Sequence, residues 1–174
     1  MNFLDPHDAL KQFQIYGTQD VADFGAGAGH FAFAAARRLD GGRLFAIDLE
    51  KEMLTRLVAE AKLLGHTNIF PIWADAAKPK SIPLADASLD AIIIANVLNQ
   101  VDDRNGLIDE AKRLLKPDGK ILFIEWKDSQ KGGPHGKHKV PEHIALSLFN
   151  KHGFGMDRYI DAGEYHYGII MVRN

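Results

Sequence analysis

The sequence predicts an α/β fold whose sheet is doubly wound and mostly parallel. Three observations favour it: short apolar runs alternate with helical patterns, a glycine-rich turn follows an early run, and the C-terminal stretch has the pattern of a β-hairpin. The chain has 174 residues, of which 46% are hydrophobic and 25% are charged. This composition is sufficient for the core of one compact domain, so we expect a single domain over residues 1–174.

The expected elements follow one another as a parallel sheet with crossover helices requires. A first helix is predicted to start at Asp5 and Pro6, where a capping side chain precedes a proline at the first helical position. Five apolar runs are predicted to be strands: Val21–Phe24, Arg43–Ile47, Asn68–Trp73, Ala91–Ala95 and Lys120–Trp126. Each is expected to be buried on both faces. Helical patterns lie between them at Gly29–Leu39, Glu50–Leu64 and Arg104–Leu115.

The C-terminal part departs from this alternation. After a predicted helix at Pro141–His152, two strand-like stretches, Met156–Ile160 and Tyr165–Val172, are joined by a turn at Asp161–Gly163. We expect these strands to form a hairpin that closes the otherwise parallel sheet. Within it, His166 is expected to face outward or to pair across the hairpin.

The run VADFGAGAGHF, from Val21 to Phe31, joins an apolar strand that ends in an acid to three alternating glycines and then to a helix. Gly25, Gly27 and Gly29 can adopt backbone angles that are closed to other residues, and they let the backbone approach a ligand closely. The free N–H groups at the start of the following helix point at that ligand. The run therefore predicts a cradle for a nucleoside cofactor.

The spacing of the glycines indicates which cofactor is bound. The dinucleotide fingerprint G-x-G-x-x-G would place its third glycine at position 30, where this chain has His30. The run is instead G-x-G-x-G with Asp23 ahead of it, and in this form it resembles the glycine-rich first motif of class I S-adenosylmethionine-dependent methyltransferases. A nicotinamide enzyme and a purely structural glycine turn remain as alternatives.

The resemblance continues through later motifs in the correct order, over about residues 20–126. Asp48, in LFAIDLEKEML, matches the acid that holds the ribose hydroxyls in this family, with Leu49 next to it to pack on the adenine. Asp75 matches an acid that reads the adenine amino group, with the N–H of Ala76 donating to the ring. From the residues alone, Asp48 is also a candidate cap for the next helix, and Asp75 a candidate surface acid.

The family implies a Rossmann-like doubly wound sheet with the strand order 3-2-1-4-5-7-6, in which the last two strands form the antiparallel hairpin. It also implies S-adenosylmethionine as cofactor and S-adenosylhomocysteine as product. The cofactor-binding residues expected from the motifs and their places in the sheet are Asp23, Gly25, Ala26, Gly27, Gly29, Asp48, Leu49, Asp75, Ala76 and Asn96.

The acceptor is expected beyond the carboxyl ends of the strands, where ligands bind in doubly wound sheets. The segment after the fourth strand resembles that of small-molecule methyltransferases, including those acting on quinone precursors, although histidines often stand there at the positions of Asn99 and Gln100. No catalytic residue is assigned, because in-line displacement at a sulfonium methyl group mainly requires alignment. The expected substrate contacts are Asn99, Glu125, Trp126, Lys127, His135 and His138.

Composition excludes several other functions. The chain has no cysteine, which rules out disulfides, thiolate metal sites and a cysteine nucleophile. The formal net charge of −2 gives no sign of the basic face that nucleic acids require. His135, His138 and His143 match no known metal-ligand pattern, so we expect solvated loop histidines and no metal.

The N-terminus has no targeting pattern, and no apolar run is long enough to span a bilayer, so we expect a cytoplasmic protein that does not contact membranes. The segments Asn2–Gly17 and Asp128–Lys139 are the available lid material, which makes the N-terminal cap minimal. Such an open pocket suggests a homodimer or a large acceptor.

Taken together, the motifs predict an S-adenosylmethionine-dependent methyltransferase that acts on a small molecule. The alternatives are a non-catalytic sensor or partner subunit that binds the same cofactor, a protein methyltransferase, and a nicotinamide oxidoreductase.

Overall fold

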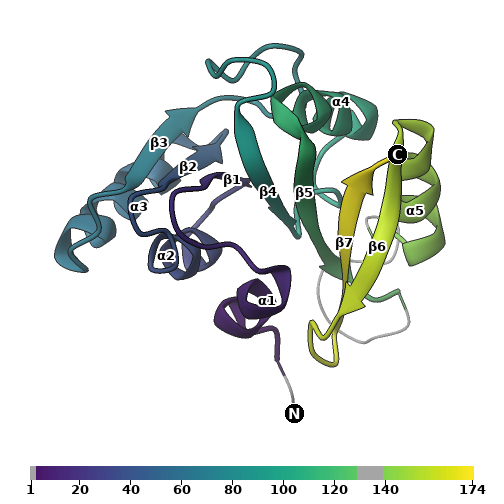
Figure 1. The fold of residues 1–174 in the computed structure, drawn as a ribbon, viewed down its shortest axis with the longest axis horizontal. Coiled ribbons are helices and arrows are strands. Elements are labelled where there is room, and N and C mark those ends of the chain that lie inside the picture. Colours follow the sequence, from purple (N-terminus) through teal and green to yellow (C-terminus); the bar gives the residue numbers. More distant parts are fainter. Residues whose placement is uncertain (1–2, 129–138) are drawn as a thin grey trace.

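The structure, a computed structural model, describes residues 3–128 and 139–174. These residues contain one sheet of seven strands in the order β3-β2-β1-β4-β5-β7-β6 (Figure 1). The strands are β1 (Asp20–Phe24), β2 (Arg43–Asp48), β3 (Ile69–Trp73), β4 (Leu89–Ala95), β5 (Leu115–Trp126), β6 (Phe154–Ile160) and β7 (His166–Arg173). β7 runs antiparallel to β5 and β6, whereas the other neighbours are parallel. The predicted fold class, strand order and C-terminal hairpin are confirmed.

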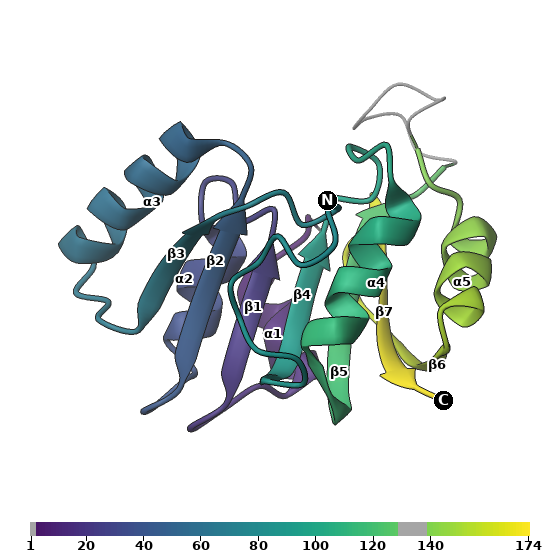
Figure 2. The ribbon, with the colours of Figure 1, turned by 90° about the horizontal axis from the view of Figure 1, so that it is seen from above.

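Helices cover both faces of this sheet. They are α1 (Pro6–Phe13), α2 (His30–Ala36), α3 (Lys51–Leu63), α4 (Arg104–Leu114) and α5 (Glu142–Lys151). The buried side chains of α1, α2 and α3 belong to one apolar cluster, and those of α4 and α5 belong to another. Figure 2 shows the consequence, with α4 in front of the strands and α1 and α2 behind them.

The central strands supply both apolar clusters because their side chains alternate between the two faces. Ile93 and Leu122 pack with α1, α2 and α3, whereas Ile92 and Phe123 pack with α4 and α5. All four side chains are completely buried. Each such burial contributes about 1.5–3 kcal/mol to stability, so the middle of the sheet is the most firmly held part of the fold.

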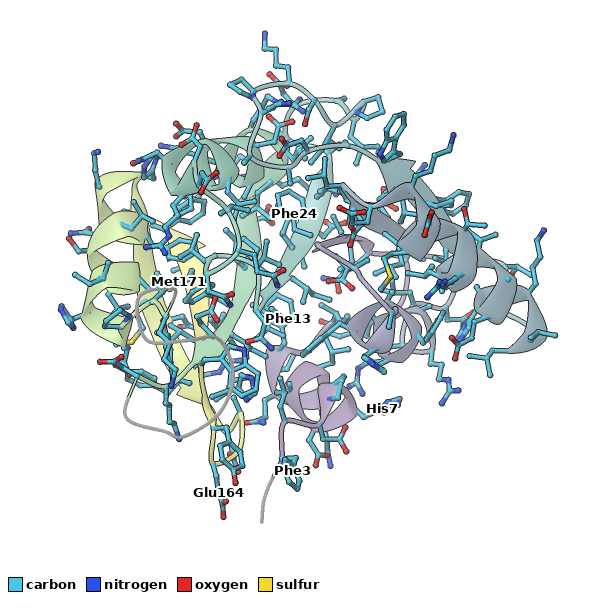
Figure 3. All side chains as sticks on the ribbon, turned by 180° about the vertical axis from the view of Figure 1, so that it is seen from behind. Phe3, His7, Phe13, Phe24, Glu164 and Met171 are labelled. Carbon is cyan, nitrogen blue, oxygen red and sulfur yellow. The ribbon has the colours of Figure 1, made fainter. Side chains whose placement is uncertain are left out.

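The N-terminal segment is fastened to the hairpin at the far end of the chain. The side chain of Gln12 donates to the carbonyl of Asp161 (3.1 Å) and accepts from its N–H (2.9 Å). The ring of Phe3 stacks on that of Tyr165, with 5.7 Å between their centroids. In Figure 3, Phe3 lies beside the turn that carries Glu164. The cap is thus short, but it has a fixed position.

Strand β3 differs from the expectation that each strand is buried on both faces. Phe70 is 42% exposed and Trp73 is 64% exposed. The reason is position: among the described residues β3 is an edge strand of the sheet, so its side chains have neighbouring strand residues on one side only. Sequence pattern alone does not reveal which apolar strand takes the edge.

Two element boundaries also differ from the prediction. α2 ends at Ala36 instead of Leu39, because the last turn is tightened by a hydrogen bond from the Leu39 N–H to the Ala36 carbonyl. β5 begins at Leu115, directly after α4, instead of at Lys120, and its pairing with β4 is irregular at this end.

The described segment 74–88, between β3 and β4, contains no helix and is held by a buried acid of α4. The carboxylate of Glu110, which is 2% exposed, accepts from the N–H groups of Lys80 (2.9 Å) and Ile82 (3.3 Å). It also accepts from Arg113 at 2.7 Å. Because the buried charge is paired and hydrogen-bonded, its desolvation cost is offset.

We expect Arg113→Leu to lower the free energy of unfolding by about 3–5 kcal/mol, because it leaves the Glu110 carboxylate buried without its cation. Urea denaturation followed by circular dichroism measures this loss. The control is the double variant Glu110→Met/Arg113→Leu. It leaves no unpaired charge buried, so its free energy of unfolding should fall by less than that of Arg113→Leu. A single variant as stable as the wild type would contradict this account of the segment.

Candidate functional site

The candidate site lies at the carboxyl ends of β1, β2 and β4. β1 pairs with β2 on one side and with β4 on the other, so the chain reverses its direction of winding at this point. In open α/β sheets this is where ligands bind. In Figure 2 the arrowheads of β1, β2 and β4 point to the same end of the sheet, which is the end where the site lies.

The glycine loop after β1 depends on backbone angles that other residues rarely adopt. Gly25, Gly27 and Gly29 have φ of 68°, 51° and 85°. A β-carbon on Gly25 would come within 2.6 Å of Val97, and one on Gly29 within 2.8 Å of Phe33. At Gly27 the nearest atom would be 3.8 Å away, so this glycine leaves open space beside the backbone. Packing therefore requires the outer two glycines, and the middle one faces a cleft.

Asp48, at the end of β2, joins the glycine loop to the start of α3. Its Oδ2 accepts from the Gly27 N–H (2.7 Å) and its Oδ1 accepts from the Glu50 N–H (2.8 Å). Asp48 therefore does not cap α3 itself, whose N-cap residue is Glu50, but holds the backbone just before that helix while it also contacts the glycine loop. A carboxylate fixed in this way faces the same space as Gly27.

Two clefts open on either side of the glycine loop and share Gly25 and Gly27 in their walls. Cleft A, of about 440 Å³, lies between the loops after β2, β3 and β4. Besides these two glycines, its walls bring together four more of the predicted residues, Asp48, Leu49, Asp75 and Ala76. Cleft B, also of about 440 Å³, brings together Asp23, Ala26 and Asn96, with Leu4, Pro6 and Phe31 as apolar wall.

The residues of cleft A are held by the loops that carry them. The Asp75 carboxylate accepts from the Ala77 N–H (3.1 Å) and pairs with Lys78 (3.5 Å). Leu49 is 58% exposed and its carbonyl accepts from the indole N–H of Trp73 (2.9 Å). Cleft A thus offers carboxylates at two corners and an aliphatic side chain between them.

Asp23 lies in the wall of cleft B and is 3% exposed. Burial, together with the nearby charge of Asp48, raises its pKa to about 8, although the Ala32 N–H stabilises the carboxylate. At neutral pH the carboxyl group is therefore mostly protonated, and it can donate a hydrogen bond as well as accept one.

Asn96 follows β4 and has a φ of 59°, a left-handed conformation that asparagine tolerates better than most residues. Its Nδ2 lies 3.2 Å from Nε2 of His166. The prediction that His166 faces outward or pairs across the hairpin is wrong: the residue is 7% exposed, and its ring lies 4.1 Å from that of Trp126 on β5. The antiparallel register of β5 and β7 sets these two residues opposite each other.

Asn99 and Glu125, two of the expected acceptor contacts, are hydrogen-bonded to each other. Glu125 is completely buried, and its carboxylate accepts from the backbone and side-chain N–H groups of Asn99 (3.1 and 2.6 Å) and from the Trp126 N–H (3.0 Å). Burial raises its pKa. Neither residue is among those that line clefts A and B, and their hydrogen bonds fasten the loop after β4 to β5.

The other expected acceptor contacts have different positions. Trp126 is half-buried against His166, and the ammonium of Lys127 donates to the carbonyl of Gly163 (3.1 Å). His135 and His138 lie outside the described residues. Leu4, Pro6 and Phe31, which line cleft B, were not among the expected site residues, although Leu4 and Pro6 lie in the segment expected to serve as lid.

We expect Gly25→Ala to be more destabilising than Gly27→Ala by about 1–3 kcal/mol. Both variants incur a similar cost for a left-handed alanine, about 1–2 kcal/mol, but only the first also forces a methyl group against Val97. Thermal and urea unfolding measure the difference. In a Val97→Ala background the difference in stability between the two glycine variants should become smaller. An equal loss of stability in Gly25→Ala and Gly27→Ala would contradict the packing requirement.

Stability should depend on pH through Asp23. Its folded-state pKa of about 8 lies above the usual value, so the folded protein holds a proton that the unfolded chain has released. Between about pH 5 and 8 the free energy of unfolding should therefore fall as pH rises, by up to about 1.4 kcal/mol per unit. The control is Asp23→Asn, whose free energy of unfolding should change less with pH over this range. Parallel profiles for the two proteins would contradict the raised pKa.

Comparisons with known proteins agree with this geometry. The family described as "Methyltransferase domain" matches residues 22–123. A malonyl-[acyl-carrier protein] O-methyltransferase from Hahella chejuensis is 33% identical over 104 residues, which cover 60% of this chain and 35% of that protein. A ubiquinone/menaquinone biosynthesis C-methyltransferase UbiE from Syntrophotalea carbinolica is 30% identical over 118 residues, which cover 68% of this chain and 48% of that protein. The chain thus spans about half or less of these curated relatives.

The crystal structure of an S-adenosylmethionine-dependent methyltransferase from Aquifex aeolicus has the same fold. It superposes with a TM-score of 0.90 at 26% identity, over 98% of this chain and 90% of that chain. The family match covers the glycine loop, Asp48, Asp75 and the end of β4. The match thus includes every residue that lines cleft A and all of those that line cleft B except Leu4 and Pro6, and the chain belongs to the methyltransferase domain family.

Proposed function

We propose that this protein transfers the methyl group of S-adenosylmethionine to a small-molecule acceptor by in-line displacement. The observation that carries the proposal is the pair of clefts that meet at Gly25 and Gly27, one lined by Asp48 and Asp75 and the other by apolar side chains and Asn96. Two adjoining clefts allow the cofactor and a second molecule to be held next to each other, which is the main requirement for this reaction.

The residues of cleft A fit the nucleoside half of the cofactor. The Asp48 carboxylate can accept from ribose hydroxyls, and Asp75 with the Ala76 N–H can pair with the adenine edge. Leu49 and Met53 add apolar wall on which a base can lie. The backbone of Gly27, which has open space where a side chain would be, suits the close approach of a ligand.

The methionine half is then assigned to the glycine loop side of cleft B, with Asp23, Ala26, Gly29 and Asn96 completing the proposed cofactor site. Bound there, S-adenosylmethionine supplies a methyl group that is already activated by the sulfonium. The chain's own task is to orient two molecules and to exclude water. Leu4, Pro6 and Phe31 serve the second purpose, because they cover cleft B with apolar surface.

A neutral, compact acceptor suits the remaining wall of cleft B, because the described residues that line this cleft include no lysine or arginine. The printed names of the two curated relatives point to acceptors of different kinds, a carrier-bound malonyl group and a quinone precursor. We favour the quinone-precursor-like branch of small-molecule methyltransferases. The proposed acceptor contacts stay those expected from the sequence: Asn99, Glu125, Trp126, Lys127, His135 and His138.

Other features of the whole protein remain predictions. Among the described residues, no helix is long and apolar enough to cross a membrane. We retain the proposals of a single domain over residues 1–174, a cytoplasmic location, no nucleic-acid partner and a homodimer. No observation in the structure favours a non-catalytic sensor, a protein acceptor or a nicotinamide enzyme over a small-molecule methyltransferase.

Calorimetric titration tests the cofactor assignment. We expect S-adenosylmethionine and S-adenosylhomocysteine to bind the wild type and NAD not to bind. Asp48→Ala should lower the affinity for each of these two ligands by at least about tenfold, because a hydrogen bond to a charged group is worth about 1.5–3 kcal/mol. Asp118→Ala is the matched control: it removes an exposed acid that lines neither cleft, and binding should be unchanged.

Binding of NAD alone would overturn the cofactor assignment, as would equal binding by wild type and Asp48→Ala. Activity is then tested with S-adenosylmethionine carrying a labelled methyl group and a panel of small acceptors. Transfer of label to any acceptor excludes the non-catalytic sensor.

A further inference from the structure

Trp73, the last residue of β3, is a large aromatic side chain that core packing does not explain. It is 64% exposed, and it is not among the residues that line cleft A or cleft B. Tryptophan is largely buried in most folded proteins, so its presence at this position requires another reason. The indole N–H supplies one, because it donates to the carbonyl of Leu49 (2.9 Å).

The direction of this hydrogen bond follows from the chemistry of the two groups. An indole nitrogen only donates and a backbone carbonyl only accepts, so the contact has a single assignment. The face of the ring is held as well, because the ammonium of Lys51 lies 5.3 Å from the ring centroid. Lys51 is the first residue of α3. Trp73 therefore contacts both the loop after β2 and the helix that follows this loop.

The loop that Trp73 contacts is very short. Only Leu49 and Glu50 separate the end of β2 from the start of α3. The peptide group that joins these two residues is held at both of its polar atoms. Its N–H donates to the Asp48 carboxylate (2.8 Å), and its carbonyl accepts from Trp73. The two hydrogen bonds together fix the plane of this peptide group and so restrict rotation of the Leu49 backbone.

The direction of the Leu49 side chain depends on this backbone more than on its neighbours. Leu49 is 58% exposed, yet it is one of the apolar residues that line cleft A. A side chain with so little packing around it keeps much of its rotational freedom unless the backbone restricts it. Trp73 thus acts from outside cleft A on a wall inside it.

We propose that Trp73 is a positioning residue of cleft A: through the Leu49 carbonyl, its indole N–H orients the Leu49 side chain as the apolar wall on which a nucleobase lies. The inference deepens the proposed function and rests on it for the identity of the ligand. Trp73 contacts neither the ligand nor the reacting atoms in this assignment. Its contribution is preorganisation, because a wall that is already in place costs less entropy on binding.

The first measurement determines whether the hydrogen bond exists in the ligand-free protein. The full chain is labelled with ¹⁵N in its two indole rings, and Trp73→Phe identifies the signal of Trp73. We expect the Trp73 indole N–H to exchange with water more slowly than that of N-acetyltryptophanamide and to have a smaller temperature coefficient. Values equal to those of the free amide overturn the proposal. This result does not depend on whether the protein binds S-adenosylmethionine.

The second measurement is the affinity for S-adenosylhomocysteine of variants that differ in the donor. Trp73→Phe keeps an aromatic ring beside Lys51 but has no N–H. Trp73→His keeps a five-membered ring that has a nitrogen at the same ring position as the indole nitrogen, so it restores the donor. Phe70→Leu is the matched control, because it removes another partly exposed aromatic ring of β3, which packs on Phe45. Circular dichroism and thermal unfolding confirm that each variant is folded.

We expect Trp73→Phe to lower the affinity for S-adenosylhomocysteine by about three- to tenfold, which is the value of one hydrogen bond. Trp73→His and the control Phe70→Leu should bind within about twofold of the wild type. A loss in Trp73→His as large as in Trp73→Phe overturns the role of the N–H donor. An equal loss in Phe70→Leu overturns it too, because the effect would then belong to β3 in general.

A double-variant cycle separates the positioning of Leu49 from a general loosening of the site. In a Leu49→Ala background the side chain to be oriented is gone, so adding Trp73→Phe should cost less than about twofold in affinity. An equal loss in both backgrounds shows that Trp73 acts elsewhere and overturns the proposal. A wild type that does not bind S-adenosylhomocysteine overturns the proposed function and, with it, the positioning of a nucleobase. The indole measurement still decides in that case whether Trp73 holds the Leu49 carbonyl.

Discussion

Val97 packs against Gly25 where any other residue would place its β-carbon, and this close approach determines the form of the site. The loop after β1 has to pass between the end of β2, where Gly25 and Ala26 donate to the Ile47 carbonyl, and the residues that follow β4. Only glycine permits that path at the observed φ. Because the loop is pressed from both sides, Gly27 is left as the point at which the two clefts meet. The position of each cleft therefore follows from a packing constraint on the backbone.

Carboxylates fix the loops around this point by accepting backbone N–H groups. The same arrangement recurs at the ends of three strands and on α4, and the acids concerned are Asp48, Asp75, Glu110 and Glu125. Each acid replaces water as the partner of amides that a loop would otherwise leave unpaired. The loops lack regular secondary structure but have defined positions, so the clefts exist without a ligand to organise them. This preorganisation reduces the entropy that binding has to overcome.

The sequence was sufficient for the parts of the molecule that local rules control. Apolar runs located the strands, and Asp5 with Pro6 marked the start of α1, because strand burial and helix capping involve neighbouring residues. The glycine loop and Asp48 were recognisable for the same reason. What sequence could not supply depends on contacts between distant segments: the burial of His166 follows from its register with Trp126, and the burial of Glu125 follows from the Asn99 amides that surround it. A polar residue in a strand suggests exposure unless its partner is known.

The wall of cleft B is decided by these distant contacts. The wall of cleft B combines Leu4 and Pro6 from the N-terminal segment with Asn96 from β4. Its N-terminal part is not free to move, because Gln12 exchanges two hydrogen bonds with Asp161 and so ties α1 to the turn between β6 and β7. The other part is backed by β7 through His166. Both parts thus depend on the C-terminal hairpin, which lies beyond the residues that the family match covers. It follows that the family match covers every residue that lines cleft A, whereas the shape of cleft B in this chain also depends on how the hairpin holds its wall.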